Sequence, residues 1–419
     1  MRAYWLYPAC LLHPICIFTA CALAMPMAAS QSLAMAASQP LPAPGLKVAI
    51  DAAWQRSPLA RTLEARGDET LAGRDAAQTW IAGSPIIGLA QRSDRWTDRS
   101  DVRENEVSLS APFFLPAQKS ARQTLAQSSI DAQAAQLSDA RLSIAGEVRE
   151  RLWAVAATRE MLAEVIDHEY HLQAIADEVM LRVQAGDLAS TDGMLAQQEV
   201  LAARGTIAVA RRNAAEAWSR YHMLTGQSDI AEPIPESIAP ATPAQHPRML
   251  AAQAKLQRER MALTLVAATR SEPPVVGISM RREQDEGIAQ SRNSIGIALH
   301  IPIGTSARNR PLETAALTNI ATAMAQEAQT AAAIRSDIEL ARQQLDVSQQ
   351  ALDAAQARTA LTSEHTRLIE QAFRLGERGL ADLLRSRILA HDAESTQRQE
   401  RIAVGLAHAR INQALGVMP

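Results

Sequence analysis

Long stretches of this sequence place apolar residues at the spacing of one helix face. Between 148 and 183 these residues follow one another at intervals of three, four and seven, from Val148 and Leu152 to Val179 and Val183. Such heptad-like spacing predicts a helix that packs against its neighbours through a narrow stripe. A helix over 118–185 would be about 100 Å long, at about 1.5 Å of rise per residue.

Four short segments instead alternate apolar residues with polar or small ones. The clearest runs from Ile295 to Ile303, and a second runs from Val107 to Phe113. A period of two predicts strands with one face in an apolar medium and the other face wet or closely packed. From the pattern alone, two interpretations stay open: the strands face lipid, or they lie on a soluble helical core. The predicted strands are 85–92, 105–113, 274–281 and 294–303.

The chain contains two copies of one structural unit. The stretch "LRVQAGDLASTDGMLA" aligns with "AFRLGERGLADLLRSR", so that Gly186 falls on Gly376 and Asp192 falls on Asp382. Four further landmarks keep the same register to within one residue, which predicts a tandem duplication. The repeats span 47–226 and 247–416, and the segment 227–246 joins them through several prolines that forbid a continuous helix.

Each repeat is predicted to hold a first helical segment, two strands, a very long helix, a glycine-containing break and a closing helix. Glycine permits the left-handed backbone with which a long helix turns into an antiparallel partner. Gly186 and Gly376 are therefore predicted hairpin tips. The predicted helices are 47–80, 118–185 and 190–226 in the first repeat, and 247–270, 311–374 and 380–415 in the second.

The N-terminal residues 1–36 are predicted to be a signal peptide and its flanking segment, because an apolar run follows Arg2 and leads into small residues. Cleavage before Cys21 would produce a lipoprotein, and cleavage near Ala36 would not. All three cysteines lie in the first 21 residues, so the remainder has no thiol for a disulfide, a metal or a nucleophile. Either cleavage predicts an exported protein.

Composition and motifs argue against several functions. The net charge of −3 gives no reason to expect a nucleic-acid partner. No phosphate-binding loop, HExxH or GxSxG pattern occurs, so neither an enzyme nor a cofactor or metal site is predicted. His168 and His171 are interpreted as solvated helix surface rather than metal ligands, and His300 is a candidate for a pore-lining position.

Four strands are too few to close a barrel in one chain. Open sheet edges are not tolerated in lipid, so a membrane interpretation requires several copies. Three copies would supply twelve strands, an even number within the outer-membrane range. The predicted fold class is mainly α with a small β part: duplicated long helical hairpins forming a trimeric α-barrel, with four strands per chain in a twelve-stranded outer-membrane β-barrel.

The layout resembles the TolC-type outer-membrane efflux factors over nearly the whole mature chain. The motifs that carry the resemblance are "RVQAGDLASTDGMLAQQEVLAA", "AFRLGERGLADLLRSRILAHDAE", "SAPFFLP" and "IPIGTSAR". It implies a homotrimer that receives substrate from an inner-membrane resistance-nodulation-division pump through a periplasmic adaptor. The compact length and the "AGDLA" tip are most similar to the heavy-metal cation (CzcC-like) branch, while multidrug export stays open, as does a periplasmic coiled-coil scaffold without a pore.

The resemblance also implies roles for residues at the hairpin tips. An acidic ring narrows the periplasmic entrance in such proteins; Asp382 matches its first position, and Arg385 stands where some members have a second acid. A mixed Asp382/Arg385 lock, with Asp192 in the first repeat, is the expected gate. The residues expected to contact the adaptor are Gly186, Asp187, Leu188, Gly376, Glu377 and Arg378.

Overall fold

The computed structural model describes residues 45–94, 103–240, 242–284 and 291–419, all within one unit, 43–419. The predicted signal peptide, 1–36, and the lipidation candidate Cys21 lie outside the described residues. The helices are α1 (Leu46–Arg56), α2 (Pro58–Gln78), α3 (Pro116–Ala185), α4 (Ser190–Thr225), α5 (Pro247–Ala268), α6 (Ser306–Arg374) and α7 (Leu380–Ala414), with a 3-10 turn at Pro243–Gln245. The strands are β1 (Ile86–Ser93), β2 (Arg103–Pro112), β3 (Val275–Gln284) and β4 (Arg292–His300).

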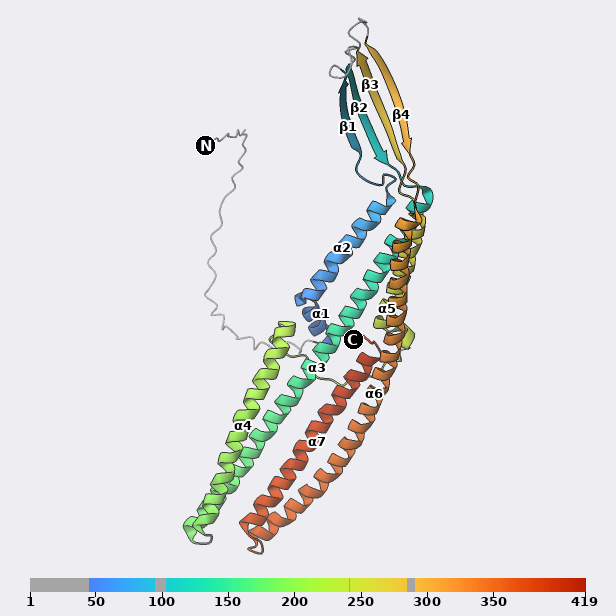
Figure 1. Ribbon diagram of the computed structural model, residues 1–419. Coiled ribbons are helices and arrows are strands. Elements are labelled where there is room, and N and C mark those ends of the chain that lie inside the picture. Colours follow the sequence, from blue (N-terminus) through green and yellow to red (C-terminus); the bar gives the residue numbers. More distant parts are fainter. Residues whose placement is uncertain (1–44, 95–102, 241, 285–290) are drawn as a thin grey trace, which may run out of the picture. The chain divides into compact units, whose positions relative to one another are not determined.

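The four strands form one antiparallel sheet in the order β1-β2-β3-β4. The central pair, β2 with β3, joins the two halves of the sequence. The sheet lies at one end of the long helices, and the α3–α4 and α6–α7 turns lie at the other end (Figure 1). A helix, two strands, a very long helix and a closing helix occur in this order twice, and α1 precedes the first set.

The two longest helices owe their length to well-formed ends and to interiors with few interruptions. α3 has 70 residues, which corresponds to about 105 Å. Pro116 occupies its first turn, where no backbone donor is needed, and the Gln118 side chain accepts a hydrogen bond from the Leu115 N–H at 3.1 Å. α6 has 69 residues.

The structure corrects several predicted boundaries. β2 starts at Arg103 rather than 105 and β3 ends at Gln284 rather than 281, so both extend farther at the loop end. The first helical segment, predicted over 47–80, is two helices, because Ser57 is extended and Pro58 starts a new helix. β4 ends at His300 rather than 303: His300 pairs with Val275, the first residue of β3, and Pro302 has no N–H to donate. α6 starts at Ser306 rather than 311, and Pro311 is accommodated near its N-terminal end.

The helices pack as two antiparallel hairpins that meet through α3 and α7. Near the turns, Leu172 and Val179 of α3 share one buried cluster with Leu383 and Leu384 of α7. Farther along, α7 comes so close to α3 that a Cβ on Gly405 would lie 2.1 Å from the Trp153 ring. No helix in the described part of the chain combines the length and apolarity required to cross a bilayer.

Candidate functional site

One face of the sheet consists of apolar rows that run across all four strands. Ile87, Leu109, Ile278 and Ile297 are in register, and the neighbouring row is Leu89, Val107, Met280 and Ile295. These side chains are between 51% and 79% exposed. We refer to this side as the apolar face.

The opposite side, which we refer to as the polar face, is lined by small and polar residues. Its central row is Gly88, Ser108, Ser279 and Gly296, and a Cβ on Gly88 would lie 2.5 Å from the Ser108 hydroxyl oxygen. Along β2 the polar-face residues are less exposed than the apolar ones. A sheet in water buries its apolar side, so this sheet has the reverse polarity. Strands of outer-membrane barrels have this polarity.

The two outer strands leave the sheet open. Within the described residues β1 pairs only with β2 and β4 pairs only with β3, so each presents a row of unpaired backbone groups. In an apolar medium each such group costs several kcal/mol, on the order of the transfer cost of an unpaired amide. The sheet therefore requires further strands on both sides if its apolar face is in lipid.

The turns at the opposite end of the helices have the same geometry in both hairpins. At the end of α3, Gly186 has φ 85°, and the N–H groups of Gly186 and Asp187 donate to Val183 and Arg182. At the end of α6, Gly376 has φ 78°, and the corresponding bonds run from Gly376 and Glu377 to Phe373 and Ala372. Both are Schellman caps, in which glycine takes the left-handed position.

Replacing Gly186 with alanine is expected to destabilise the α3–α4 hairpin by about 1 kcal/mol, because the left-handed backbone disfavours a Cβ. A Cβ at Gly186 would meet nothing within 4 Å, so the effect is purely conformational. The measurement is thermal unfolding followed by circular dichroism. Gly205, which lies inside α4 and also has open space but no left-handed backbone, is the control: Gly205→Ala is expected to cause no loss, because alanine is favoured over glycine inside a helix, and an equal loss in both variants would contradict the interpretation.

The acidic residues predicted for the gate lie in the first turns of the returning helices, Asp192 in α4 and Asp382 in α7. The Asp382 carboxylate lies 3.7 Å from the Arg378 guanidinium, and both side chains are more than half exposed. The ion pair of Asp382 within one chain is thus made with Arg378 rather than with Arg385. Leu188 of the first turn packs against the buried cluster near the turns.

A partly buried polar contact between α3 and α7 was not predicted. The rings of His168 and His391 stack with centroids 3.6 Å apart, and His391 Nδ1 lies 2.7 Å from Glu164 Oε1, although the two atoms lack hydrogen-bond geometry. Burial lowers the pKa of His168 from 6.5 to about 4, and His391 acts in the same direction. The interpretation of His168 as solvated surface is therefore wrong. His168 is four residues from both Glu164 and Leu172, so the three side chains share one helix face. This spacing could have indicated that His168 lies on the packed side of α3.

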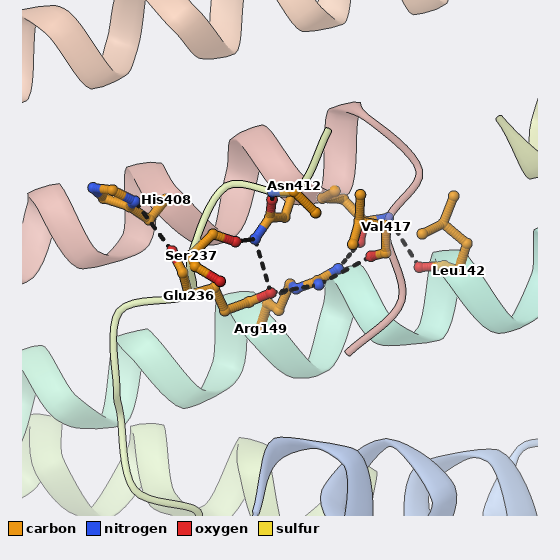
Figure 2. Close-up of polar contacts among 9 residues, drawn as sticks. Leu142, Arg149, Glu236, Ser237, His408, Asn412 and Val417 are labelled. Carbon is orange, nitrogen blue, oxygen red and sulfur yellow. Dashed lines mark hydrogen bonds and ion pairs between the residues drawn. The ribbon is translucent and has the colours of Figure 1, made fainter. Parts of the chain in front are cut away.

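A second buried network fixes the segment after α4 to both hairpins (Figure 2). Arg149 of α3 is 2% exposed and donates to both carboxylate oxygens of Glu236, at 2.8 and 2.7 Å. It also donates to the Gln413 side chain at 2.7 Å and to the Val417 carbonyl at 3.1 Å. Asn412 of α7 donates to the Ser237 carbonyl at 2.9 Å, where the elements converge in Figure 2. The proline-rich segment is therefore a fixed part of the structure.

Within the described ranges no group of three or more His, Cys, Asp or Glu side chains is placed to hold a metal ion. His300, the candidate for a pore-lining position, is the last residue of β4 and lies on the polar face, in register with Val275.

Comparison with known proteins places the fold. No protein-family model matches the sequence, and no curated protein matches it. A membrane protein from Pseudomonas aeruginosa is similar in structure, with a TM-score of 0.72 and 17% identity over 89% of this chain and 90% of that one. The outer membrane protein VceC from Vibrio cholerae has a TM-score of 0.69 and 16% identity, covering 89% of this chain and 96% of VceC.

The CmeC outer membrane channel from Campylobacter jejuni has a TM-score of 0.70 and 14% identity, covering 88% of this chain and 85% of CmeC. The likeness therefore extends over the sheet and both hairpins. The predicted fold, that of the TolC-type channels, is confirmed.

Proposed function

We propose that this chain, which has the fold of the TolC-type outer-membrane channels, is one subunit of a homotrimeric outer-membrane efflux channel. Three sheets form a twelve-stranded barrel in the outer membrane, and three sets of helical hairpins form a tube that extends into the periplasm. Such a duct conducts substrate passively and needs no catalytic group, because pore width and lining charge set what passes.

The reverse polarity of the sheet carries this proposal. Its apolar rows are exposed, its polar face is lined by glycine and serine, and β1 and β4 are unpaired. Pairing β4 of one copy with β1 of the next satisfies these edges and puts the apolar rows on the outside of a closed barrel. A periplasmic scaffold without a pore would expose the same rows to water at a large hydrophobic cost.

Disulfide trapping between subunits tests the assembly. A cysteine in β1 combined with one in β4, in a chain whose native cysteines are replaced, is expected to give oxidised dimers and trimers in outer-membrane fractions. A β2–β3 cysteine pair is the control and should cross-link only within one chain. A detergent-solubilised monomer, or release of the protein from membranes by a salt wash, would contradict the channel and favour the scaffold.

The turns at the far end of the helices are the proposed contact for a periplasmic adaptor that connects the channel to an inner-membrane resistance-nodulation-division pump. Gly186, Asp187 and Leu188 form one contact, and Gly376 with its neighbours Glu377 and Arg378 forms the other. The support is the identical Schellman geometry of the two turns, which presents the same backbone shape twice per chain.

Heavy-metal cations are the proposed substrate, with organic compounds as the alternative. The support is the similarity of the compact length and the "AGDLA" tip to the CzcC-like branch. Deletion of the gene is expected to sensitise cells to zinc, cobalt or cadmium salts more than to detergents and dyes. The reverse order of sensitivity would favour multidrug export.

We expect Asp382 and Arg385, with Asp192, to narrow the periplasmic entrance of the trimer. Replacing Asp382 with alanine removes three carboxylates from the ring and is expected to raise single-channel conductance and lower cation preference in planar bilayers. Asp187→Ala, which removes an acid from the turn itself, is the comparison. Unchanged conductance and preference in Asp382→Ala would exclude Asp382 from the entrance.

A further inference from the structure

The polar face of the sheet carries a compact set of charged residues near the loop end of the strands. Arg281 of β3 lies between two carboxylates of β2, with ion-pair distances of 2.5 Å to Glu104 and 3.3 Å to Glu106. Arg92 of β1 approaches Glu104 at 3.7 Å. The side chains of Glu104 and Glu106 are 17% and 26% exposed, so both are held against the sheet. We refer to Glu104, Glu106 and Arg281 as the charged layer.

The charged layer differs from the rest of the polar face. The next two rows toward the helices contain no ionisable side chain among the described residues: one is Gly88, Ser108, Ser279 and Gly296, and the other is Ile86, Ser110, Gly277 and Ala298. The row beyond them holds Pro112, Val275 and His300, of which only His300 can be ionised. Glu106 and Arg281 stand in the row directly beside the apolar row of Leu89, Val107, Met280 and Ile295. The layer therefore lies where the apolar face gives way to polar residues.

Within a closed barrel, side chains of the polar face line the water-filled interior. The effective dielectric constant inside a pore is lower than in bulk water, so fixed charges there interact more strongly with passing ions. One uncompensated charge per subunit therefore affects ions across the lumen. In the native chain Arg281 offsets part of the charge of Glu104 and Glu106. Arg92, Glu283 and Arg292 share the row of Glu104, so the six charges in its row and the row of Glu106 sum to zero. Loss of Arg281 leaves one uncompensated negative charge per chain.

We propose that Glu104, Glu106 and Arg281 form the ion-selective layer of the barrel interior, and that Arg281 suppresses a cation preference which the two carboxylates would otherwise impose. This inference rests on the proposed channel function and adds the residues that determine its selectivity at the outer end. It concerns small permeating ions and is separate from the expected entrance at the helical turns.

Reversal potentials in planar bilayers test the proposal, with a gradient of about 0.1 M to about 0.01 M KCl so that the Debye length stays at about 10–30 Å. Arg281→Gln is expected to shift the reversal potential towards cation preference. The double variant Glu104→Gln/Glu106→Gln is expected to shift it in the opposite direction. Arg282→Gln is the matched control: it makes the same charge change one residue along β3 but on the other face, and should leave the potential unchanged.

Each outcome decides between the proposals. Native trimers that form no channels would overturn the channel function and this inference with it. Channels whose selectivity is the same in the native protein, Arg281→Gln and the double variant would overturn the selective layer alone, as would an equal shift in Arg282→Gln. If Arg281→Gln yields no trimers, the double variant alone decides, because its shift towards anion preference does not depend on Arg281 being replaced.

Discussion

Replacing Arg149 with methionine is expected to lower the free energy of unfolding by about 3–5 kcal/mol, the cost of leaving one partner of a buried ion pair uncompensated. Arg149 is 2% exposed and holds Glu236 through two hydrogen bonds. Without the guanidinium, the Glu236 carboxylate keeps only a 3.3 Å contact from Asn412. The Gln413 side chain and the Val417 carbonyl lose a donor as well. The measurement is urea unfolding of the detergent-solubilised protein, followed by circular dichroism at 222 nm.

Arg410 provides a matched control for this prediction. It is also an arginine that binds a glutamate with two hydrogen bonds, at 2.7 and 2.9 Å to Glu150, and it also joins α7 to α3. Both side chains are close to half exposed, so Arg410→Met should cost no more than about 1 kcal/mol. Equal losses in the two variants would show that burial does not control the contribution of the Arg149 network.

Acidification from pH 7 to pH 4 is expected to remove about 2 kcal/mol of stability through His168 alone. In the folded protein burial lowers the pKa of this histidine to about 4, against 6.5 for an unperturbed side chain. Below pH 6.5 the unfolded chain takes up a proton that the folded protein does not. The contribution of His168 is therefore complete above pH 6.5 and is lost as the pH falls to about 4. The full difference corresponds to about 3 kcal/mol, and solvent screening of the partly exposed ring reduces it.

The pH dependence of His168→Gln isolates this contribution from that of the many carboxylates. Its unfolding midpoint should fall less between pH 7 and pH 4 than that of the native protein. His171→Gln, which changes a more exposed histidine on the same helix, should retain the native dependence. A native-like dependence in His168→Gln would mean that the stacked pair with His391 does not resist protonation.

The sequence was sufficient for those parts of the fold that rest on local periodicity and on glycine. The heptad-like stripe ending at Val183 predicted α3, and the alternation from Ile295 predicted β4. In each case the repeat of the helix or strand places regularly spaced apolar residues on one face, so the spacing can be read from the sequence. Gly186 and Gly376 predicted the turns because a left-handed backbone has few other occupants. The break between α1 and α2 was not predicted, because the helical pattern continues on both sides of Pro58.

The polar contacts could not be predicted because they join residues that are far apart in the chain. His168 meets His391, and Arg149 meets Glu236 and Gln413, only after α7 has packed against α3. The spacing of residues within one helix does not show which other helix it will pack against. The pairing of Asp382 with Arg378 illustrates a related limit: Arg378 and Arg385 both lie within one helical turn of Asp382, and the turn geometry, rather than the spacing, selects between them.

The pairing of β2 with β3 also governs how the chain must be built. All of α3, α4 and α5 intervenes between these two strands, and chains are made from the N-terminus onward. During synthesis the β1–β2 hairpin is therefore complete long before its partner strand exists, and a lone hairpin is at best marginally stable in water. Until β3 arrives, the β2 edge is unpaired as well, beside the exposed Ile87, Leu89, Val107 and Leu109 side chains, and an apolar strand with a free edge tends to aggregate. The first hairpin is thus the segment most prone to aggregate until the second half of the chain pairs with β2.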